Sequence, residues 1–292
     1  MTDKVQLRVV KAIQCSVWTE PNRIAGDVVW VSRDGAEQLV KLGLCEYFGN
    51  AFESAESGPL RKSLGWPLDR FSWVSKDWDG ETVACIASGP STTEEDLHRV
   101  KSHGIKAIVV NDMYLVAPWA DVVYFADCRW WEWHHNGVAK KWDWMEFTAE
   151  EQRAAFGAFA GQKCTIANTG MLVGDPEVFM LKNGGHLGLS ESKDALFTGS
   201  NSGYQAINLA CLAGAKKILL LGYDLGFHKN RSHSHNGHPI KNTSAAHYSG
   251  WASNFFSLVE PLERLGIEVI NCSRQTTLKA FRREALESIL PD

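Results

Sequence analysis

The fold is decided by residues 198–224, which read TGSNSGYQAINLACLAGAKKILLLGYD. A loop of small residues opens an apolar helix, Gly214 closes that helix, and the buried strand 217–221 ends on Gly222 and Asp224. A helix that starts after a tight polar loop presents free backbone N–H groups to an anion. Open α/β sheets bind their ligands at the carboxyl ends of strands. The stretch therefore predicts an enzyme that handles a phosphorylated or nucleotide substrate.

Composition sets the broad class of the protein. The chain has 292 residues, of which 45% are hydrophobic and 22% charged, as expected for one large or two smaller globular domains. A net charge of −4 predicts no affinity for nucleic acid or for anionic membranes. No apolar window is long enough for a transmembrane segment. Seven scattered cysteines without a Cys-x-x-Cys pair predict a reduced, cytoplasmic location.

The first fifty residues differ in rhythm from the rest of the chain. Residues 5–13 and 27–32 have the apolar pattern of strands, and residues 34–43 have that of a short helix stopped by glycine. Residues 1–50 are therefore predicted to form a small β-β-α module, which resembles small domains of phage head and tail accessory proteins. The polar, irregular residues 51–80 are predicted to form a linker.

From residue 81 to residue 292, predicted strands alternate with predicted helices. This alternation predicts the α/β class, with a doubly wound, Rossmann-like parallel sheet in a nucleotide-binding transferase domain. A polar stretch at 226–246 is predicted to form a lid. The predicted strands are 82–87, 106–110, 122–125, 164–167, 217–221 and 267–271, and the predicted helices are 92–101, 127–135, 148–159, 201–213, 248–265 and 277–289.

The first strand of this domain ends in a loop that suits a phosphate. The loop reads Ser88-Gly89-Pro90-Ser91, where Gly89 permits a tight turn, and Thr92 and Glu95 have the spacing of a capping box. Free N–H groups and hydroxyls there can bind phosphate. A plain helix cap is the alternative interpretation.

Two polar residues follow the next two predicted strands. Asn111 comes after the second strand and Asp127 after the third, so both are expected at the carboxyl edge of the sheet. An amide at that edge can pair with a base or a ribose. The alternative is that both residues simply form turns.

The polar stretch 226–246 is rich in histidine and also contains lysine and arginine. No carboxylate or cysteine in the stretch completes a metal site, so no metal is predicted, and a mobile lid over an anionic donor is favoured. His247 opens the next helix and is predicted to act as a general base, the alternative being a hydrogen-bonded surface histidine. The cationic and imidazole side chains of the lid are His228, Lys229, Arg231, His233, His235 and His238.

Six of the twelve tryptophans lie between residues 119 and 144. A packed aromatic cover over the edge of the sheet is the favoured interpretation. The alternatives are a stacking platform for a sugar or base and a docking patch for a partner.

Over residues 81–285, the order of these motifs resembles bacterial sialyltransferases that modify cell-surface glycans. The same core is similar to motility-accessory glycosyltransferase-like proteins and to an archaeal-type pterin diphosphokinase. The resemblance rests on Ser88-Gly89-Pro90-Ser91, Asn111, Ser200-Asn201-Ser202-Gly203, Gly222-Tyr223-Asp224, His247-Tyr248 and the strand at 266–273.

The resemblance implies an inverting transfer from a CMP-activated, sialic-acid-like sugar to a hydroxyl of a glycan or small acceptor. It implies no required cofactor, and it makes His247 the base that deprotonates the acceptor. The lid residues expected to take part are His228, Arg231 and Tyr248. The residues predicted to bind the nucleotide are Ser88, Gly89, Pro90, Ser91, Asn111, Asp127, Ser200, Asn201, Ser202, Gly222 and Asp224.

Two features depart from the family pattern. The family stabilises the departing phosphate with lid tyrosines, whereas this region offers tyrosine only at positions 223 and 248, and a basic lid suits a diphosphate better. The module at 1–50 also lies outside the pattern. The alternatives are therefore a Mg²⁺-dependent pterin-type diphosphotransferase and a non-catalytic phage virion protein. Self-association and association with a virion both stay open.

Overall fold

The computed structural model describes residues 4–9, 13–14, 22–23, 28–32, 45–47, 71–167, 177–228, 230–236, 238 and 244–291. The chain divides into two compact units, the first made of residues 1–70 with 168–172 and the second of residues 71–167 with 173–292. None of the described helices has the length and apolar character needed to cross a membrane.

The first unit contains a small antiparallel sheet with the strand order β4-β1-β5. The strands predicted at 5–13 and 27–32 are present as β1 and β4, although β1 ends at Val9. The helix predicted at 34–43 lies outside the described residues. The strands of this unit are β1 (Lys4–Val9), β2 (Ile13–Gln14), β3 (Asn22–Arg23), β4 (Val28–Ser32) and β5 (Cys45–Tyr47), with β2 pairing to β3.

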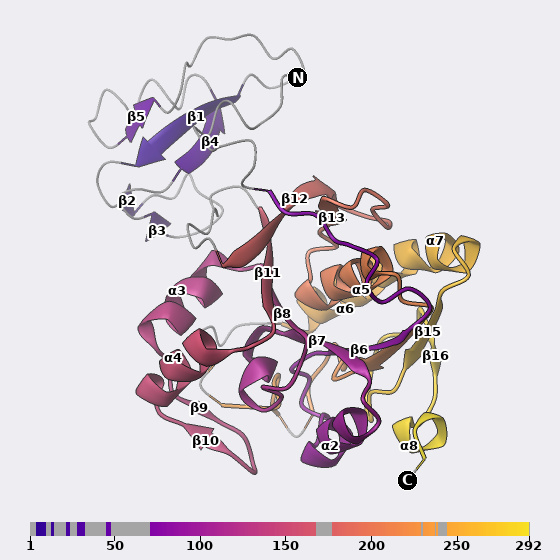
Figure 1. The fold of residues 1–292 in the computed structure, drawn as a ribbon. Helices are drawn as coiled ribbons and strands as arrows, with labels where there is room; N and C mark the ends of the chain where they lie inside the picture. Colours follow the sequence, from indigo (N-terminus) through magenta and orange to yellow (C-terminus); the bar gives the residue numbers. More distant parts are fainter. Residues whose placement is uncertain are drawn as a thin grey trace. The chain divides into compact units, whose positions relative to one another are not determined.

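The second unit is built on a nine-stranded parallel sheet with helices around it, which confirms the predicted α/β fold (Figure 1). Its strand order is β13-β12-β11-β8-β7-β6-β14-β15-β16. The chain adds strands outward from β6 to β13, then returns to the other side of β6 to add β14, β15 and β16. These strands are β6 (Thr82–Ile86), β7 (Lys106–Val110), β8 (Val122–Phe125), β11 (Gln162–Ala167), β12 (Val178–Gly185), β13 (Ala195–Phe197), β14 (Lys217–Leu221), β15 (Glu268–Asn271) and β16 (Arg282–Arg283).

The order of strands places the topological switch point between β6 and β14. The central strands are almost continuously apolar and buried, as expected for parallel strands covered on both faces. Helix α5 (Ser202–Ala213) crosses the sheet in contact with β6, β7, β8 and β13. In a doubly wound sheet, the crevice for a ligand opens at the carboxyl side of the switch point.

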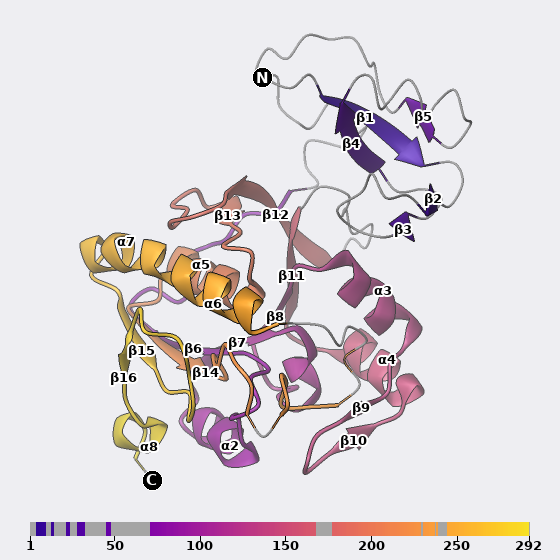
Figure 2. The ribbon, with the colours of Figure 1, turned by 180° about the vertical axis from the view of Figure 1, so that it is seen from behind.

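The remaining helices pack around this sheet (Figure 2). The helix predicted at 248–265 is instead three segments, because a 3₁₀ turn places Phe255 and Leu258, three residues apart and both fully buried, on the same side. The other helices are α2 (Glu94–Ser102), η2 (Asn111–Leu115), α3 (Cys128–Asn136), α4 (Ala149–Ala158), α6 (Ala245–Asn254), η3 (Phe255–Leu258), α7 (Val259–Arg264) and α8 (Leu286–Ile289), and a short hairpin pairs β9 (Lys140–Lys141) with β10 (Glu146–Phe147).

Two predicted helix boundaries are wrong for identifiable reasons. Helix α2 starts at Glu94, two residues later than predicted. Its capping box joins Thr93 to Asp96 and not Thr92 to Glu95, because the Thr92 hydroxyl donates to the Ala87 carbonyl. The long closing helix at 277–289 is absent, and only α8 is helical there. Thr276 Oγ1 accepts from the amide of Leu278 at 3.0 Å, a local bond between side chain and backbone that competes with helix formation.

Residues 71–80, predicted as the end of the linker, pack onto the second unit. The amide of Ser72 donates to the Met180 carbonyl at 3.0 Å, and the amide of Val74 donates to the Lys193 carbonyl at 2.7 Å. The rest of the predicted linker lies outside the described residues. The second unit therefore gains an extra segment along β12 before its first strand begins.

Candidate functional site

The loops that follow β6 and β14 are bonded to each other at the switch point. The amide of Gly89 donates to the Gly222 carbonyl at 3.0 Å. Ser91 donates twice to Asp224, from its amide at 2.8 Å and from its hydroxyl at 2.7 Å. A Cβ on Gly89 would lie 2.3 Å from the Gly222 carbonyl oxygen, so only glycine fits. Two motifs that are 133 residues apart in the chain thus meet at the carboxyl ends of β6 and β14.

Asp224 is buried, and its carboxyl group ties these loops together. Burial raises its pKa to about 6, although the hydrogen bonds from Ser91 and the nearby His228 act in the opposite direction. The carbonyl of Asp224 also accepts from the amide of Thr277 at 2.8 Å. Asp224, predicted as a nucleotide ligand, therefore anchors the loop, because both of its carboxylate oxygens are occupied by Ser91.

The raised pKa of Asp224 makes stability depend on pH. The carboxyl binds its proton more tightly in the folded chain than in the unfolded chain, so stability falls as pH rises from about 4 to about 6. The difference between 3.8 and about 6 corresponds to about 3 kcal/mol. We expect urea unfolding of wild type to lose that much more stability than Asp224→Asn between pH 4 and pH 7. Parallel pH profiles for the two proteins would contradict this assignment.

Asn111 stands at the carboxyl end of β7, in a backbone conformation that few residues adopt. Its φ is +53°, in the left-handed region where asparagine is tolerated better than most residues. Its Oδ1 is buried without a hydrogen-bond partner. A residue in this sparsely populated backbone region with an unsatisfied polar atom is a candidate functional position. Asn111 is the predicted site residue with the clearest structural signature.

The start of α5 is bonded to the loop after β14, and it is partly capped. The Tyr223 hydroxyl donates to the Gly203 carbonyl at 2.9 Å, joining the two segments. Asn201 Oδ1 accepts from the amides of Gly203 and Tyr204, so two of the free N–H groups of the helix are already occupied. Ser200, just before the cap, is exposed and has φ +57°, whereas Gly199 beside it is buried.

His247 lies in the first turn of α6, and its side chain is exposed. Its Nδ1 contacts the hydroxyl of Ser244, the N-cap residue, at 2.8 Å. Further along α6, Asn254 Nδ2 donates to the Gly199 carbonyl at 2.9 Å, which places this helix beside the start of α5. The neighbouring Tyr248 is buried, and its hydroxyl donates to the Ser232 carbonyl at 3.4 Å.

Residues 231–236 of the predicted lid form a strap that is bonded to both sides of the crevice. The amide of Ser234 donates to the Ser88 carbonyl at 2.8 Å, and the amide of Asn236 donates to the Lys141 carbonyl at 2.7 Å. Arg231 makes a two-bond ion pair with Asp143, both bonds at 2.8 Å. The part of the predicted lid at 231–236 is thus docked in this structure, with Arg231 paired at its outer end, while residues 229, 237 and 239–243 lie outside the described residues.

The strap inserts His235 into a buried charge cluster around Asp112. Two further members are Lys140 and His134, and all four side chains are at most 2% exposed. Burial disfavours the ionised form of Asp112, but His235 and Lys140 beside it hold its pKa well below the usual range. The stretch 226–246 contains no carboxylate, but the fold brings Asp112 to His235 from 123 residues away in the chain. No group of side chains able to hold a metal occurs among the described residues.

Two of the tryptophans between 119 and 144 belong to this same region. Trp130 and Trp142 are buried, and their indole N–H groups donate to Asp112 at 2.9 Å and to Ser234 at 3.2 Å. Trp130 also stacks on Phe125 with ring centroids 4.8 Å apart. These two residues therefore have the packing role favoured by the sequence, with the added task of holding polar groups.

Asp127 is not joined to the other predicted residues by any contact among the described residues. It caps α3 by accepting from the amide of Arg129 at 2.9 Å, and its carboxylate also pairs with the guanidinium of Arg129. Asp127 thus caps a helix at the end of its loop, which agrees with the alternative interpretation given for it.

His228 and Arg231 exchange backbone hydrogen bonds in a tight turn that leads into the strap.

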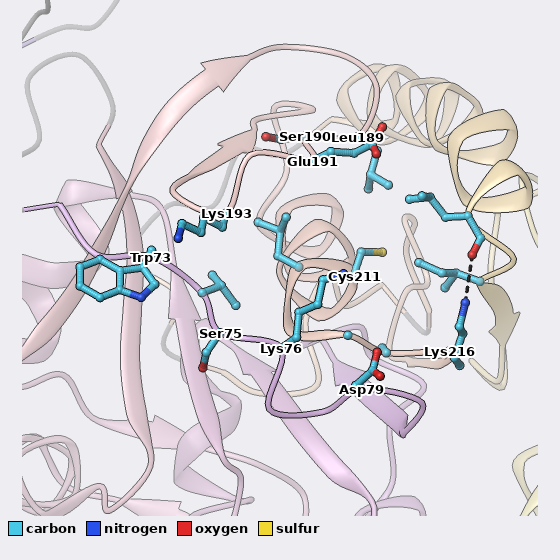
Figure 3. Close-up of a pocket in the computed structure, with 16 residues that line it drawn as sticks. Trp73, Ser75, Lys76, Asp79, Leu189, Ser190, Glu191, Lys193, Cys211 and Lys216 are labelled. Carbon is cyan, nitrogen blue, oxygen red and sulfur yellow. Dashed lines mark hydrogen bonds between the residues drawn. The ribbon is translucent and has the colours of Figure 1, made fainter.

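A separate hollow of about 470 Å³ lies at the opposite, amino edge of the sheet (Figure 3). It is lined by the segments that precede β6, β14 and β15, and it contains none of the predicted site residues. One lining residue, Lys216, donates to the Leu265 carbonyl at 3.1 Å. Because doubly wound sheets bind ligands at the carboxyl edge, we place the candidate site at the switch point.

In comparisons with known proteins, no protein-family model, curated protein or solved structure matches this chain.

Proposed function

We propose that the chain is a glycosyltransferase that moves a sialic-acid-like sugar from a nucleotide-activated donor to a hydroxyl of a glycan or small acceptor. The observation that carries the proposal is Asn111, whose strained backbone and unpartnered, buried Oδ1 stand beside the topological switch point. A donor group of a ligand would supply the missing hydrogen bond. The order of motifs around the crevice supports a nucleotide as that ligand.

In this proposal the two walls of the crevice have different roles. The loop Ser88-Gly89-Pro90-Ser91 and Asn111 hold the nucleotide, and the open loop at Ser200 receives its phosphate. His247 is the general base. Because its Nδ1 is directed at Ser244, the proton of the acceptor hydroxyl would pass to Nε2. The acceptor oxygen then attacks the anomeric carbon of the sugar, and the bond to the nucleotide phosphate breaks. No cofactor is required for this step.

Nucleotide binding tests the proposal directly. We expect isothermal titration with CMP, CDP, UDP, GDP and ATP to show binding of at least one, with CMP as the expected ligand. Asn111→Asp keeps the shape of the side chain and its tolerance of positive φ. It also adds a negative charge beside an anionic ligand, so the affinity should fall at least tenfold. Asn136→Asp, on an exposed asparagine at the end of α3, is the matched control. If no nucleotide binds, the proposal is wrong.

Turnover tests the role of His247. We expect His247→Ala to abolish sugar transfer while leaving nucleotide affinity within about twofold, since the imidazole acts on the acceptor. ATP-dependent transfer that stops in EDTA would identify the Mg²⁺-dependent diphosphotransferase instead. Stable co-sedimentation with phage capsids or tails, without turnover, would identify a virion protein.

A further inference from the structure

Four hydrogen-donating groups converge on the buried carboxylate of Asp112. Trp130 Nε1 lies 2.9 Å and His134 Nε2 2.5 Å from Oδ1, while Lys140 Nζ lies 2.9 Å and His235 Nε2 2.8 Å from Oδ2. The two histidine contacts are within ion-pair distance but lack hydrogen-bond geometry. Taking such charges out of water costs several kcal/mol per ion, so a buried cluster is weak evidence for stability and better evidence for fixing one arrangement.

Only one member of the cluster comes from the strap. Asp112 lies in η2, His134 and Trp130 lie in α3, and Lys140 lies in β9, all of which belong to one side of the sheet. His235 comes from beyond β14, on the other side of the switch point. Other strap residues also bond to these elements, through the Asn236 amide, the Arg231–Asp143 pair and the bond from Trp142 Nε1 to Ser234 Oγ. Among the described strap residues, His235 is the one whose side chain reaches the carboxylate of Asp112.

The hydrogen bonds around His134 determine which of its two ring nitrogens carries the proton. Its Nδ1 is 2.7 Å from Gln152 Nε2, which is a donor, so Nδ1 accepts and Nε2 carries the proton toward Asp112. Burial lowers the pKa of His134, which keeps the ring neutral. Lys140 is thus the charged partner of Asp112 at Oδ2, and His235 Nε2 approaches the same oxygen.

The cluster also touches the candidate site, because Asp112 directly follows Asn111. Holding Asp112 from four directions fixes the 3₁₀ turn that begins at Asn111. The strained φ of Asn111 costs about 1–3 kcal/mol and persists only where neighbouring contacts determine it. Asp112 therefore both contacts the strap, through His235, and holds the backbone turn that begins at Asn111.

We propose that His235 is a positioning residue: by pairing with Asp112 it pins the strap across the crevice, so that the docked strap and a ligand at Asn111 stabilise each other. The coupling to a ligand rests on the proposed function. The pin itself does not, because it is a contact within the chain.

Hydrogen exchange of the strap amides tests the pin. We compare wild type, His235→Gln and His235→Leu at Ser234 and Asn236, whose amides are bonded across the crevice. Glutamine keeps a donor for Asp112, whereas leucine fills similar volume without one. We expect exchange in the leucine variant to be at least tenfold faster than in wild type, and the glutamine variant to stay near wild type. Exchange in β6 and the behaviour of His98→Leu, an exposed histidine on α2, are the controls.

Unchanged protection in His235→Leu would overturn the pin, and so would equal loss in the leucine and glutamine variants, which would indicate packing alone. Calorimetry with CMP tests the coupling. We expect at least fivefold weaker binding to His235→Leu and near-normal binding to His235→Gln. Equal affinity in wild type and leucine variant would overturn the coupling. If CMP and the other nucleotides bind no form of the protein, the proposed function and the coupling both fall, while the exchange result still decides the pin.

Discussion

Gly222→Ala is expected to lower the free energy of unfolding by about 2–5 kcal/mol. The backbone of Gly222 has φ +70°, which costs a residue with a side chain about 1–2 kcal/mol. A Cβ there would also lie 2.1 Å from the Ala87 carbonyl oxygen, and a forced backbone shift typically adds 1–3 kcal/mol. Urea unfolding followed by tryptophan fluorescence measures the change.

Gly250→Ala is the matched control for this prediction. Gly250 lies in α6, and nothing stands within 4 Å of the position that its Cβ would take. Alanine there should raise stability by about 0.5–1 kcal/mol, since glycine is a poor helix residue. A Gly222→Ala protein within 1 kcal/mol of wild type would contradict the tight approach of the β6 and β14 loops.

Asp112→Asn is expected to cost about 3–5 kcal/mol, because it leaves Lys140 buried without a counter-charge. The loss should come from the stranded ammonium and not from the missing carboxylate as such. Adding Lys140→Met to the same chain should therefore recover most of the stability. Free energies of unfolding from urea at pH 7, measured for wild type, both single variants and the double variant, complete a double-mutant cycle.

Asp143→Asn provides the comparison at the surface. Asp143 pairs with Arg231 with a side chain that is 67% exposed, and such pairs contribute no more than about 1 kcal/mol. If Asp112→Asn and Asp143→Asn destabilise the chain equally, the cluster around Asp112 is not the buried charge centre described above.

The sheet could be predicted from sequence where the strands are short apolar runs. Strands β7, β8 and β14 have the predicted bounds, because residues buried on both faces leave a continuous apolar signal. Strand β12 was not predicted, since its second half, Lys182-Asn183-Gly184-Gly185, is polar and glycine-rich. Pairing with β11 and β13 makes it a strand, and such pairing is a tertiary effect.

The candidate site was predictable only in part, for a related reason. Asn111 and Gly222 could be found because each stands directly after a recognisable strand. Asp112 gives no comparable signal, since its partners Lys140 and His235 come from distant parts of the chain. The bond between Asp224 and Ser91 could not be predicted, because the two residues are far apart in sequence and meet only in the folded chain. Side-chain pairing across the switch point has no periodicity in sequence.

The switch point also has a consequence for how the chain is made. Strand β6 is synthesised first, but its neighbour β14 follows only after about 130 further residues, which takes roughly ten seconds on a ribosome. Until then one side of β6 is an unpaired edge, the kind of surface at which strands from other chains add. The early sheet from β6 to β13 can grow on its other side without closing that edge. The nascent protein is thus most prone to aggregate through the same strand whose end later forms the crevice.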